Sequence, residues 1–581
     1  MVRGYMLVTG LLLLLLAGSA VYVLLADYDA LLNNIVATIN KNGIAAKIRN
    51  ELFTRHRFLQ LQWAAKIILL LLPLLGWLLY RYQFMLQQRI AFFVSSLISC
   101  LKELIQVFKE NTRTQNLSVL LLLLSIIVFF TYHMVTAYLT YDEMWNYNYY
   151  THAPFYYSFF TYSNYPFFEI TTHLFKWLPF PMKINLRLSP MLAGVAACLL
   201  LYGCIRKYFN NHLAAMGAMA SFAFMPVSAL YMAMGKGIMH ELFFAIAAVA
   251  SVLFWLKDTR QRRYLVLYFV AAVLGLYSLS THAILLLSLL ALVFFTLINK
   301  DRKAVGTFVQ LHLAIAVTFF LLYAPMYFTT GAAIFSNIID AKLAYRHNFM
   351  VAGRWLKMLL LSYTGYTFII VLLLLALLWL FAGWRRCSPE AQRMLLVALL
   401  LPLSCFMAFL LTGLPYPARA FVFGALAIPF TIALLLQVPL RRYAIHPRTA
   451  AIGFTALLAT AIYFDARLFL PANAVDKDVE MMSRYFLHHN VKSCYDKLSG
   501  SSLFYYYYPG IEYYYRMQGR SIAFTLSAPN SMRYKPLLAT DRYDCIVQDL
   551  HAPDSLGQAQ YRLAFTDSIG RFAVWLRDDL R

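Results

Sequence analysis

The chain alternates between long apolar runs and short polar connections. Each run is long enough, or nearly so, to cross a hydrocarbon core about 30 Å thick. The runs are residues 6–25, 63–80, 117–138, 188–205, 213–232, 238–256, 264–279, 283–298, 308–328, 358–381, 394–411, 421–438 and 449–464. Because a spanning segment must satisfy its backbone hydrogen bonds internally, this pattern predicts a polytopic α-helical membrane protein with about 13 transmembrane helices.

The pattern changes at both ends of this array. Residues 89–113 are basic and amphipathic, which predicts a helix lying on the cytoplasmic face. In the C-terminal part acidic residues reappear, and short strand-like runs alternate with helical stretches. We therefore expect an N-terminal extension (1–113) with two spans, a transmembrane core (114–464) and a small α/β domain (465–581).

Charge follows the same alternation. Hydrophobic residues make up 61% of the chain and charged residues only 13%, yet the net charge is +24. Basic residues gather in alternate loops, at Arg206, Lys207, Lys257, Arg260, Arg262, Arg263, Lys300, Arg302, Lys303, Arg385, Arg386, Arg393, Arg441, Arg442 and Arg448. The positive-inside rule makes these loops cytoplasmic, so the other loops and the C-terminal α/β domain are extracytoplasmic. Because the charge sets topology and faces anionic lipid, it does not predict nucleic-acid binding.

The candidate chemistry lies in the first outer loop of the core, residues 139–186. This loop begins with TYDEMWNYNYY (140–150), which places Asp142 and Glu143 about one helical turn from the membrane boundary, with no Lys or Arg close by in sequence. One interpretation is a solvated interfacial loop, and the other is a catalytic base at the mouth of a membrane cavity. Aromatic residues dominate the rest of the loop and favour short helices lying in the interface.

The order of the motifs resembles the GT-C glycosyltransferases that use polyprenyl-phosphate sugars, such as the protein O-mannosyltransferases and the aminoarabinose transferase of lipid A. The acidic pair is followed by SNYPFFE (163–169) and by RLSPMLAG (187–194). In that family the first outer loop carries the catalytic Asp, often as Asp-Glu. An Asn-His-Pro-Pro-like motif and an Arg-Leu-Pro-Ser-like span start follow it. This chain departs from the family pattern at Tyr165, where His is usual, and has the single proline Pro166.

Two further segments resemble family motifs that hold the donor phosphate. MGKGIMH (234–240) makes Lys236 a phosphate contact, and ARAFVFGALAIP (418–429) makes Arg419 a second one. A cation at the end of a span is also a common snorkelling anchor. These two cations nevertheless lie on the outer side, against the positive-inside bias, which indicates an anion nearby.

The resemblance implies a GT-C-like fold and transfer of a single sugar from a polyprenyl-phosphate donor to an extracytoplasmic glycan, lipid or protein acceptor. It places the protein in a bacterial-type inner or plasma membrane, with its active site outside. Asp142 is the expected general base, and Glu143 orients it or binds acceptor. With one base and no opposing carboxylate nucleophile, we expect single displacement with inversion. The expected substrate contacts besides Lys236 and Arg419 are Asn164, Tyr165, Glu169, Arg187, Arg346 and His347.

Two other functions stay open at this point. A transporter or flippase of a lipid-linked sugar would bind the same lipid without bond chemistry. It is disfavoured because the sequence shows no internal symmetry and because the charges gather at the outer ends of spans. An oligosaccharide polymerase or ligase would depend on Arg and His in a large middle loop rather than on Asp142. Here the loop 329–357 holds Arg346 and His347 and is a candidate gate.

The remaining polar and sulfur-containing residues carry no strong motif. No cofactor is predicted, and a divalent metal at the acidic pair lacks a further carboxylate cluster. The seven cysteines show no zinc spacing, while Cys494 and Cys545 share the C-terminal segment, which leaves a disulfide between them open. His240 and Glu241 are interpreted as polar groups at the mouth of a span. The tyrosine runs of the C-terminal domain, at 505–508 and 513–515, form core or a sugar-facing surface, and we favour core.

Overall fold

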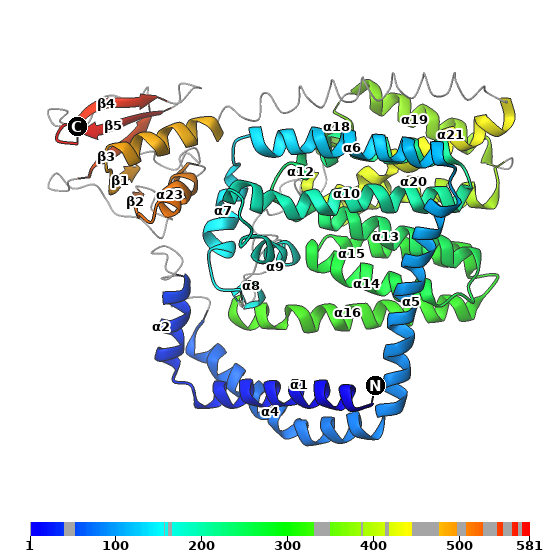
Figure 1. Ribbon diagram of the computed structural model, residues 1–581, viewed down its shortest axis with the longest axis horizontal. Helices are drawn as coiled ribbons and strands as arrows, with labels where there is room; N and C mark the ends of the chain where they lie inside the picture. Colours follow the sequence, from blue (N-terminus) through cyan, green and yellow to red (C-terminus); the bar gives the residue numbers. More distant parts are fainter. Residues whose placement is uncertain are drawn as a thin grey trace.

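The computed structural model describes residues 2–39, 53–155, 157–160, 165–330, 349–365, 367–384, 387–412, 418–443, 476–496, 507–526, 543–549, 561–566 and 572–580. Most of these residues are helical, and Figure 1 shows that most of the helices run in one direction, as in a membrane bundle. A small sheet lies at one end of the bundle, next to the helices that carry the acidic pair.

The N-terminal helices form a hairpin beside the bundle. Helix α1 (Val2–Leu25) packs along α4 (Arg55–Arg81), and the short α2 (Tyr28–Ile39) bends away from α1 by 110°. Helix α5 (Gln83–Glu110) then runs crosswise to α6 (Arg113–Thr136) and α10 (Met182–Phe209) and joins the hairpin to the bundle (Figure 1). Residues 89–113, predicted as one amphipathic helix, thus fall in α5 and at the start of the next helix.

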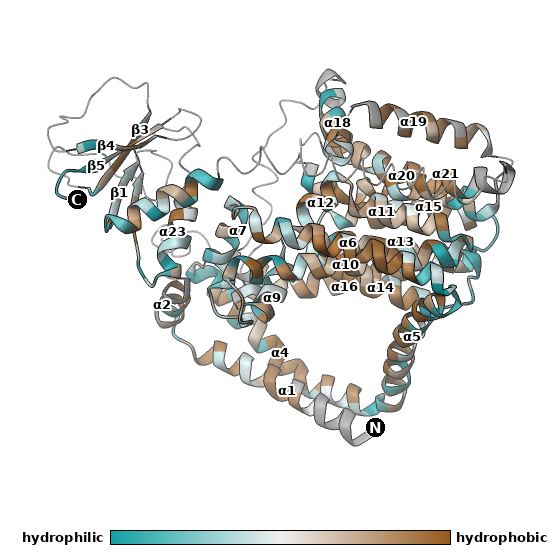
Figure 2. Ribbon diagram, turned by 45° about the horizontal axis from the view of Figure 1, so that its top comes forward, coloured by the Kyte–Doolittle hydropathy of each residue, from teal (hydrophilic) through white to brown (hydrophobic). Residues whose placement is uncertain are grey.

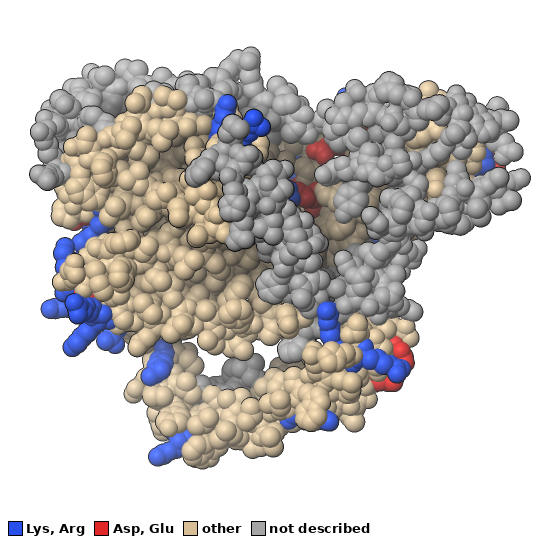
Figure 3. Space-filling view, turned by 180° about the vertical axis from the view of Figure 1, so that it is seen from behind, with Lys and Arg blue, Asp and Glu red and all other residues tan. Residues whose placement is uncertain are grey.

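Glu103 links α5 to two helices of the bundle. The carboxylate of Glu103 contacts Lys207, near the end of α10, and Arg263, at the start of α14. Lys257 at the end of α13 lies 3.9 Å from Glu390 at the start of α20. These basic loops therefore share one end of the bundle, and Figure 3 shows Lys and Arg gathered along one edge of the transmembrane part.

The transmembrane core is built around α13. Its elements are α6 (Arg113–Thr136), α10 (Met182–Phe209), α11 (His212–Ala223), α12 (Pro226–Met232), α13 (Ile238–Lys257), α14 (Arg263–Ser278), α15 (His282–Leu297), α16 (Arg302–Thr330), α18 (Phe349–Thr364), α19 (Thr367–Ala382), α20 (Pro389–Thr412), the 3-10 segment η4 (Ala418–Leu426) and α21 (Ala427–Tyr443). In the spanning part of α13, 89% of the residues are buried, and α10, α14, α15 and η4 all pack against this helix.

The predicted fold class is confirmed, although the helices do not match the thirteen runs one for one. Among the described residues eight helices are long and apolar enough to span a membrane, or up to ten if two bent pairs each count as one span. Helix α5, expected at the surface, meets that criterion, while α14 and α15 are shorter apolar helices. The run 449–464 lies outside the described residues. Figure 2 shows how hydrophobic residues dominate the bundle helices.

The C-terminal part folds as a mixed sheet with helices. A helix over residues 476–488 is followed by β1 (Ser493–Asp496), α23 (Tyr508–Met517), β2 (Ala523–Leu526), β3 (Cys545–Asp549), β4 (Tyr561–Thr566) and β5 (Phe572–Arg577). The strand order is β2-β1-β3-β5-β4, with β2, β1 and β3 parallel and β5 antiparallel to β3 and β4.

The structure bears on two predictions for this C-terminal part, the Cys494–Cys545 disulfide and the role of the tyrosines. Cys494 and Cys545 lie opposite each other on β1 and β3, and both are buried free thiols. Tyr508, Tyr513 and Tyr515 are buried at 6%, 4% and 2% exposure, so the prediction that these tyrosines form core is confirmed.

Candidate active site

The acidic pair opens a short helix, α7 (Tyr141–Asn146), just after α6. Thr140 caps this helix: its hydroxyl accepts a hydrogen bond from the Glu143 amide at 3.4 Å, and the Glu143 carboxylate accepts one from the Thr140 amide at 2.8 Å. This capping box turns Glu143 back toward the start of α7. The two acidic side chains consequently differ in exposure: that of Glu143 is fully buried and that of Asp142 is 32% exposed.

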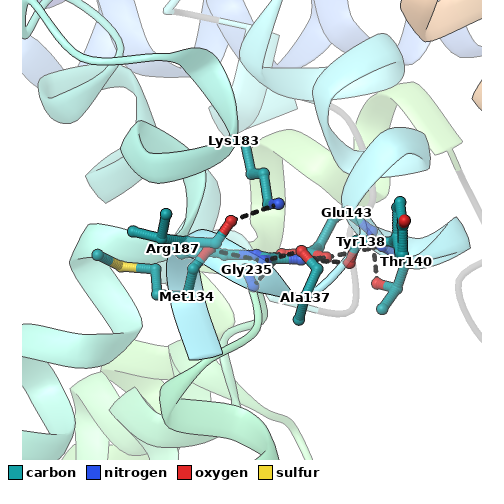
Figure 4. Close-up of polar contacts among 9 residues, drawn as sticks. Met134, Ala137, Tyr138, Thr140, Glu143, Lys183, Arg187 and Gly235 are labelled. Carbon is teal, nitrogen blue, oxygen red and sulfur yellow. Dashed lines mark hydrogen bonds and ion pairs between the residues drawn. The ribbon is translucent and has the colours of Figure 1, made fainter. Parts of the chain in front are cut away.

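Glu143 is held by Arg187 of α10 in a closed network (Figure 4). The guanidinium Nε and Nη2 donate to the two carboxylate oxygens of Glu143 at 2.6 and 2.7 Å. The remaining Arg187 donors reach the carbonyls of Met134, Ala137 and Tyr138, at 2.9, 2.9 and 2.7 Å. All five N–H groups of the fully buried Arg187 are therefore occupied, and α6, α7 and α10 are joined at one point.

The same carboxylate also holds the turn before α13. The amide of Gly235 donates to Oε1 of Glu143 at 2.7 Å, so each Glu143 oxygen accepts two hydrogen bonds. Burial alone would raise the pKa of Glu143. The Arg187 charge and the hydrogen bonds from Arg187, Thr140 and Gly235 outweigh burial and hold the pKa below its ordinary value. Glu143 is an ionised anchor with no acceptor position left.

Two glycines let this turn approach its neighbours. A Cβ on Gly235 would lie 3.0 Å from the carbonyl oxygen of Leu186 and 3.2 Å from the carboxylate of Glu143. A Cβ on Gly237 would lie 2.6 Å from Cβ of Tyr165. Such distances are too short for side chains, and glycine permits the close approach. The MGKG segment is therefore packed between the acidic pair and the NYP motif.

Lys236, between these glycines, contacts Asp142. The Lys236 ammonium pairs with Oδ2 of Asp142, and Nη1 of Arg419 lies 3.5 Å from the same oxygen. Lys236 is only 6% exposed and its ammonium lies 5.7 Å from the Tyr231 ring centre, whereas the Arg419 side chain is 47% exposed. Burial lowers the pKa of Lys236, and the Asp142 carboxylate opposes that shift. Two cations from separate loops thus converge on one partly exposed carboxylate.

The structure describes only some of the other predicted site residues. Tyr165 directly precedes α9 (Pro166–Phe175), and Glu169 is fully buried within that helix. Asn164, Arg346 and His347 lie outside the described residues. Within the part of the chain that the structure describes, no group of three or more His, Cys, Asp and Glu residues could hold a metal ion.

The C-terminal domain packs directly on the acidic helix, which the sequence did not predict. Met144 and Tyr147 belong to one hydrophobic cluster with residues of that domain, and the Tyr147 and Tyr513 rings meet edge to face at 5.0 Å. Asn148, in the π-helical turn η2 (Tyr147–Thr151), donates to the carbonyl of Pro509 at 2.7 Å.

Asp476 in the helix 476–488 extends this contact to the start of α7. Burial raises its pKa to about 7, the nearby Glu143 charge adds to the shift, and Arg187 and a hydrogen bond from the Tyr141 amide oppose it. No local motif marks Asp476 in the sequence, because its neighbours are brought to it only by the packing of the C-terminal domain.

Glu241, interpreted above as a polar group at a span mouth, has a specific partner. Its Oε1 lies 3.0 Å from Nδ1 of His282 at the start of α15, and both side chains are fully buried. Its neighbour His240 contacts the Ser189 hydroxyl through Nε2 at 2.8 Å. The pairing of Glu241 with His282 was missed because the two residues come from different spans.

Comparison with known proteins gives a consistent result. Residues 167–328 match the family of dolichyl-phosphate-mannose-protein mannosyltransferases. No curated protein sequence gives a significant match. Among solved structures, the chain is similar to apo ArnT from Cupriavidus metallidurans, with 13% identity, a TM-score of 0.50 and coverage of 79% of this chain and 97% of ArnT. It also aligns with the Archaeoglobus fulgidus oligosaccharyltransferase, with 12% identity, a TM-score of 0.46 and coverage of 74% and 68%.

The family match begins within α9 and ends in α16, so it contains Arg187, Lys236 and the Glu241–His282 pair. The likeness to ArnT shows a shared fold over most of both chains. The resemblance inferred from the motif order is thus confirmed at the level of the superfamily. Residues 167–328 are therefore similar to the dolichyl-phosphate-mannose-protein mannosyltransferases, and the chain shares the fold of ArnT.

Proposed function

We propose that the protein transfers a single sugar from a polyprenyl-phosphate donor to an acceptor on the extracytoplasmic side of the membrane. The observation that carries this proposal is the pairing of Asp142 with both Lys236 and Arg419. A base next to two cations is the set of groups that displacement of a phosphate leaving group requires. The description of the matching family, which names dolichyl-phosphate mannose, supports a donor of this class.

In the proposed reaction the acceptor hydroxyl attacks the anomeric carbon C1 of the sugar. Asp142 takes the hydroxyl proton as the new C1–oxygen bond forms. The bond from C1 to the phosphate oxygen breaks, and the lipid phosphate leaves with both bonding electrons. Lys236 and Arg419 stabilise the negative charge that this leaving group gains. One displacement from the opposite face inverts the configuration at C1.

The ion pairs suggest how donor binding prepares the base. Lys236 and Arg419 both contact Asp142. A donor phosphate competes for the same cations, and their shift toward it would release the Asp142 carboxylate for the acceptor. Because Lys236 is almost fully buried, its charge is poorly screened and it contributes more to phosphate binding than the half-exposed Arg419.

We assign Glu143 and Arg187 to positioning rather than to contact with substrate. The sequence had suggested that Glu143 orients Asp142 or binds acceptor, and that Arg187 contacts substrate. Their hydrogen-bonding groups, however, are all used within the protein, and both side chains are fully buried. We propose that this pair fixes α7 so that Asp142 faces Lys236. Tyr165 and Glu169 remain candidate sugar contacts on the same side of the bundle.

The proposal is tested by analysing the lipids of membranes that lack the protein. Mass spectrometry should find an accumulated polyprenyl-phosphate sugar, and re-expression of the wild-type chain should remove it. Re-expression of Asp142→Asn should leave it in place, whereas Asp258→Asn, a change in a loop at the other end of α13, should remove it. If Asp142→Asn cleared the lipid as well as wild type, the proposed transfer chemistry would be wrong and a flippase would be favoured.

A further inference from the structure

Lys236 and Arg419 must keep a fixed separation if both are to contact one carboxylate oxygen. Lys236 lies in the loop before α13, whereas Arg419 lies in η4. Their shared contact with Asp142 therefore depends on how α13 and η4 are held relative to each other. The structure shows α13, α15 and η4 in mutual contact.

One polar link joins α13 to α15. Glu241, in the first turn of α13, places Oε1 3.0 Å from Nδ1 of His282, the first residue of α15. Both side chains have no exposed surface. A Cβ on Gly275 of α14 would overlap the His282 ring, so the imidazole packs directly against the backbone of α14 at this glycine.

A second link joins α15 to η4. The hydroxyl of Thr281, next to His282, donates to the carbonyl of Ala420, next to Arg419. The hydroxyl of Tyr363 in α18 donates to the following carbonyl, that of Phe421, which holds η4 from the other side. Four side-chain contacts, Asp142–Lys236, Glu241–His282, Thr281–Ala420 and Arg419–Asp142, are therefore joined into a closed ring by the short chain segments 236–241, 281–282 and 419–420.

A role in geometry explains this buried pair better than a role in stability. A buried pair of ionisable groups contributes little or nothing to stability compared with apolar side chains of the same volume, because both groups lose their hydration. Ionisable side chains are rare inside membrane helix bundles, and those that occur there commonly mark functional positions. We propose that Glu241 and His282 are positioning residues that set the spacing of Lys236 and Arg419, and so determine the affinity of the site for a lipid phosphate.

This inference rests on the proposed function, and its test separates the two. The probe is undecaprenyl phosphate, and its affinity for the purified full-length protein is measured together with the melting temperature of each variant. Glu241→Met removes the hydrogen bond at similar volume and should weaken binding about tenfold. Glu241→Gln keeps an acceptor for the imidazole and should restore affinity to within about threefold of wild type. Ser288→Ala is the matched control, because this buried hydroxyl of α15 bonds only to its own helix at Ile284 and should leave affinity unchanged.

The second arm repeats Glu241→Met in a Lys236→Ala/Arg419→Ala background. If Glu241 acts through the two cations, its substitution should change affinity there by less than about twofold, since coupled residues are not additive. Thr281→Val, which breaks the link to Ala420, should reproduce the loss and provides a second variant if Glu241→Met does not fold. A folded Glu241→Met with wild-type affinity, or an equal loss in the cation-free background, would overturn the inference. A Lys236→Ala/Arg419→Ala protein that binds undecaprenyl phosphate like wild type would instead refute the proposed function.

Discussion

Lys236 and Asp142 form an ion pair whose partners come from the turn before α13 and from α7. The lysine side chain is almost fully buried, while that of the aspartate is 32% exposed. A buried ammonium needs an anion beside it, and Asp142 supplies that anion. The pair thereby links the acidic motif to the glycine-flanked turn and makes both parts of one site.

Unequal roles are expected for the two cations. Lys236→Ala should weaken binding of undecaprenyl phosphate by about ten- to a hundredfold, because a buried charge-assisted contact is lost. Arg419→Ala should have a smaller effect, since its side chain is 47% exposed. Binding titrations of both purified variants measure this difference. An equal or larger loss for Arg419→Ala would contradict the assignment of Lys236 as the main phosphate contact.

Breaking the Glu143–Arg187 pair should destabilise the protein. Glu143→Gln leaves a buried guanidinium without its counter-charge, at a cost of about 3–5 kcal/mol. Thermal unfolding in detergent should show a clear drop in melting temperature, and sugar transfer should fall with it. Asp29→Asn is the matched control, because its pair with Arg55 is exposed and contributes about 1 kcal/mol or less. Equal melting temperatures for wild type and Glu143→Gln would show that the pair does not anchor α7.

Gly237 should tolerate no side chain. In Gly237→Ala the new methyl group would lie 2.6 Å from Cβ of Tyr165, so the turn that carries Lys236 must shift. We expect weaker lipid-phosphate binding and partial recovery in Gly237→Ala/Tyr165→Gly, where Cβ and the ring of residue 165 are both removed. Gly306→Ala in α16 is the control: a Cβ there meets nothing within 4 Å, and alanine favours a helix by about 0.5–1 kcal/mol. A Gly237→Ala variant with normal affinity would contradict the close packing of the turn.

Docking of the C-terminal domain on α7 should weaken as pH rises. Burial raises the pKa of Asp476 from 3.8 to about 7, so the docked state holds the proton more tightly than the undocked state. The contribution of the protonated carboxyl is full below about pH 4 and is lost as pH rises toward 7. Hydrogen exchange of the α7 amides, corrected for intrinsic rates, should be faster at pH 8 than at pH 5.

Two variants test whether the Asp476 carboxyl causes this pH dependence. Asp476→Asn should remove the pH dependence of α7 exchange, because the amide does not titrate. Asp578→Asn, at an exposed position of the same domain, should leave it intact. If Asp476→Asn kept the full difference between pH 5 and pH 8, another group would control the docking.

The membrane architecture could be predicted from the apolar runs because a bilayer imposes length and composition on each span. The order of motifs also assigned Asp142, Lys236 and Arg419 to one face, and the contacts among them come from the structure. Span number was harder to predict, since α14 and α15 are short and α5 is apolar enough to span although it runs crosswise in the bundle. Length alone does not distinguish these cases.

The roles of single side chains depended on contacts between distant segments. Thr140 and Glu143 have the spacing of a capping box, and that signal could have shown that Glu143 turns inward. Its pairing with Arg187, and that of Glu241 with His282, follows only from helix packing. Asp476 has no signal in the sequence, because the docking of the C-terminal domain creates its environment.

The central claim is that Asp142 acts as the base while its two cations hold the phosphate. The most direct measurement compares sugar transfer and undecaprenyl-phosphate binding in purified Asp142→Asn and wild type. Transfer should fall by about 10²–10⁴-fold, the usual contribution of a general base. Lipid-phosphate affinity should stay equal or increase, because Lys236 and Arg419 no longer pair with a carboxylate. Full transfer activity in Asp142→Asn would contradict the account.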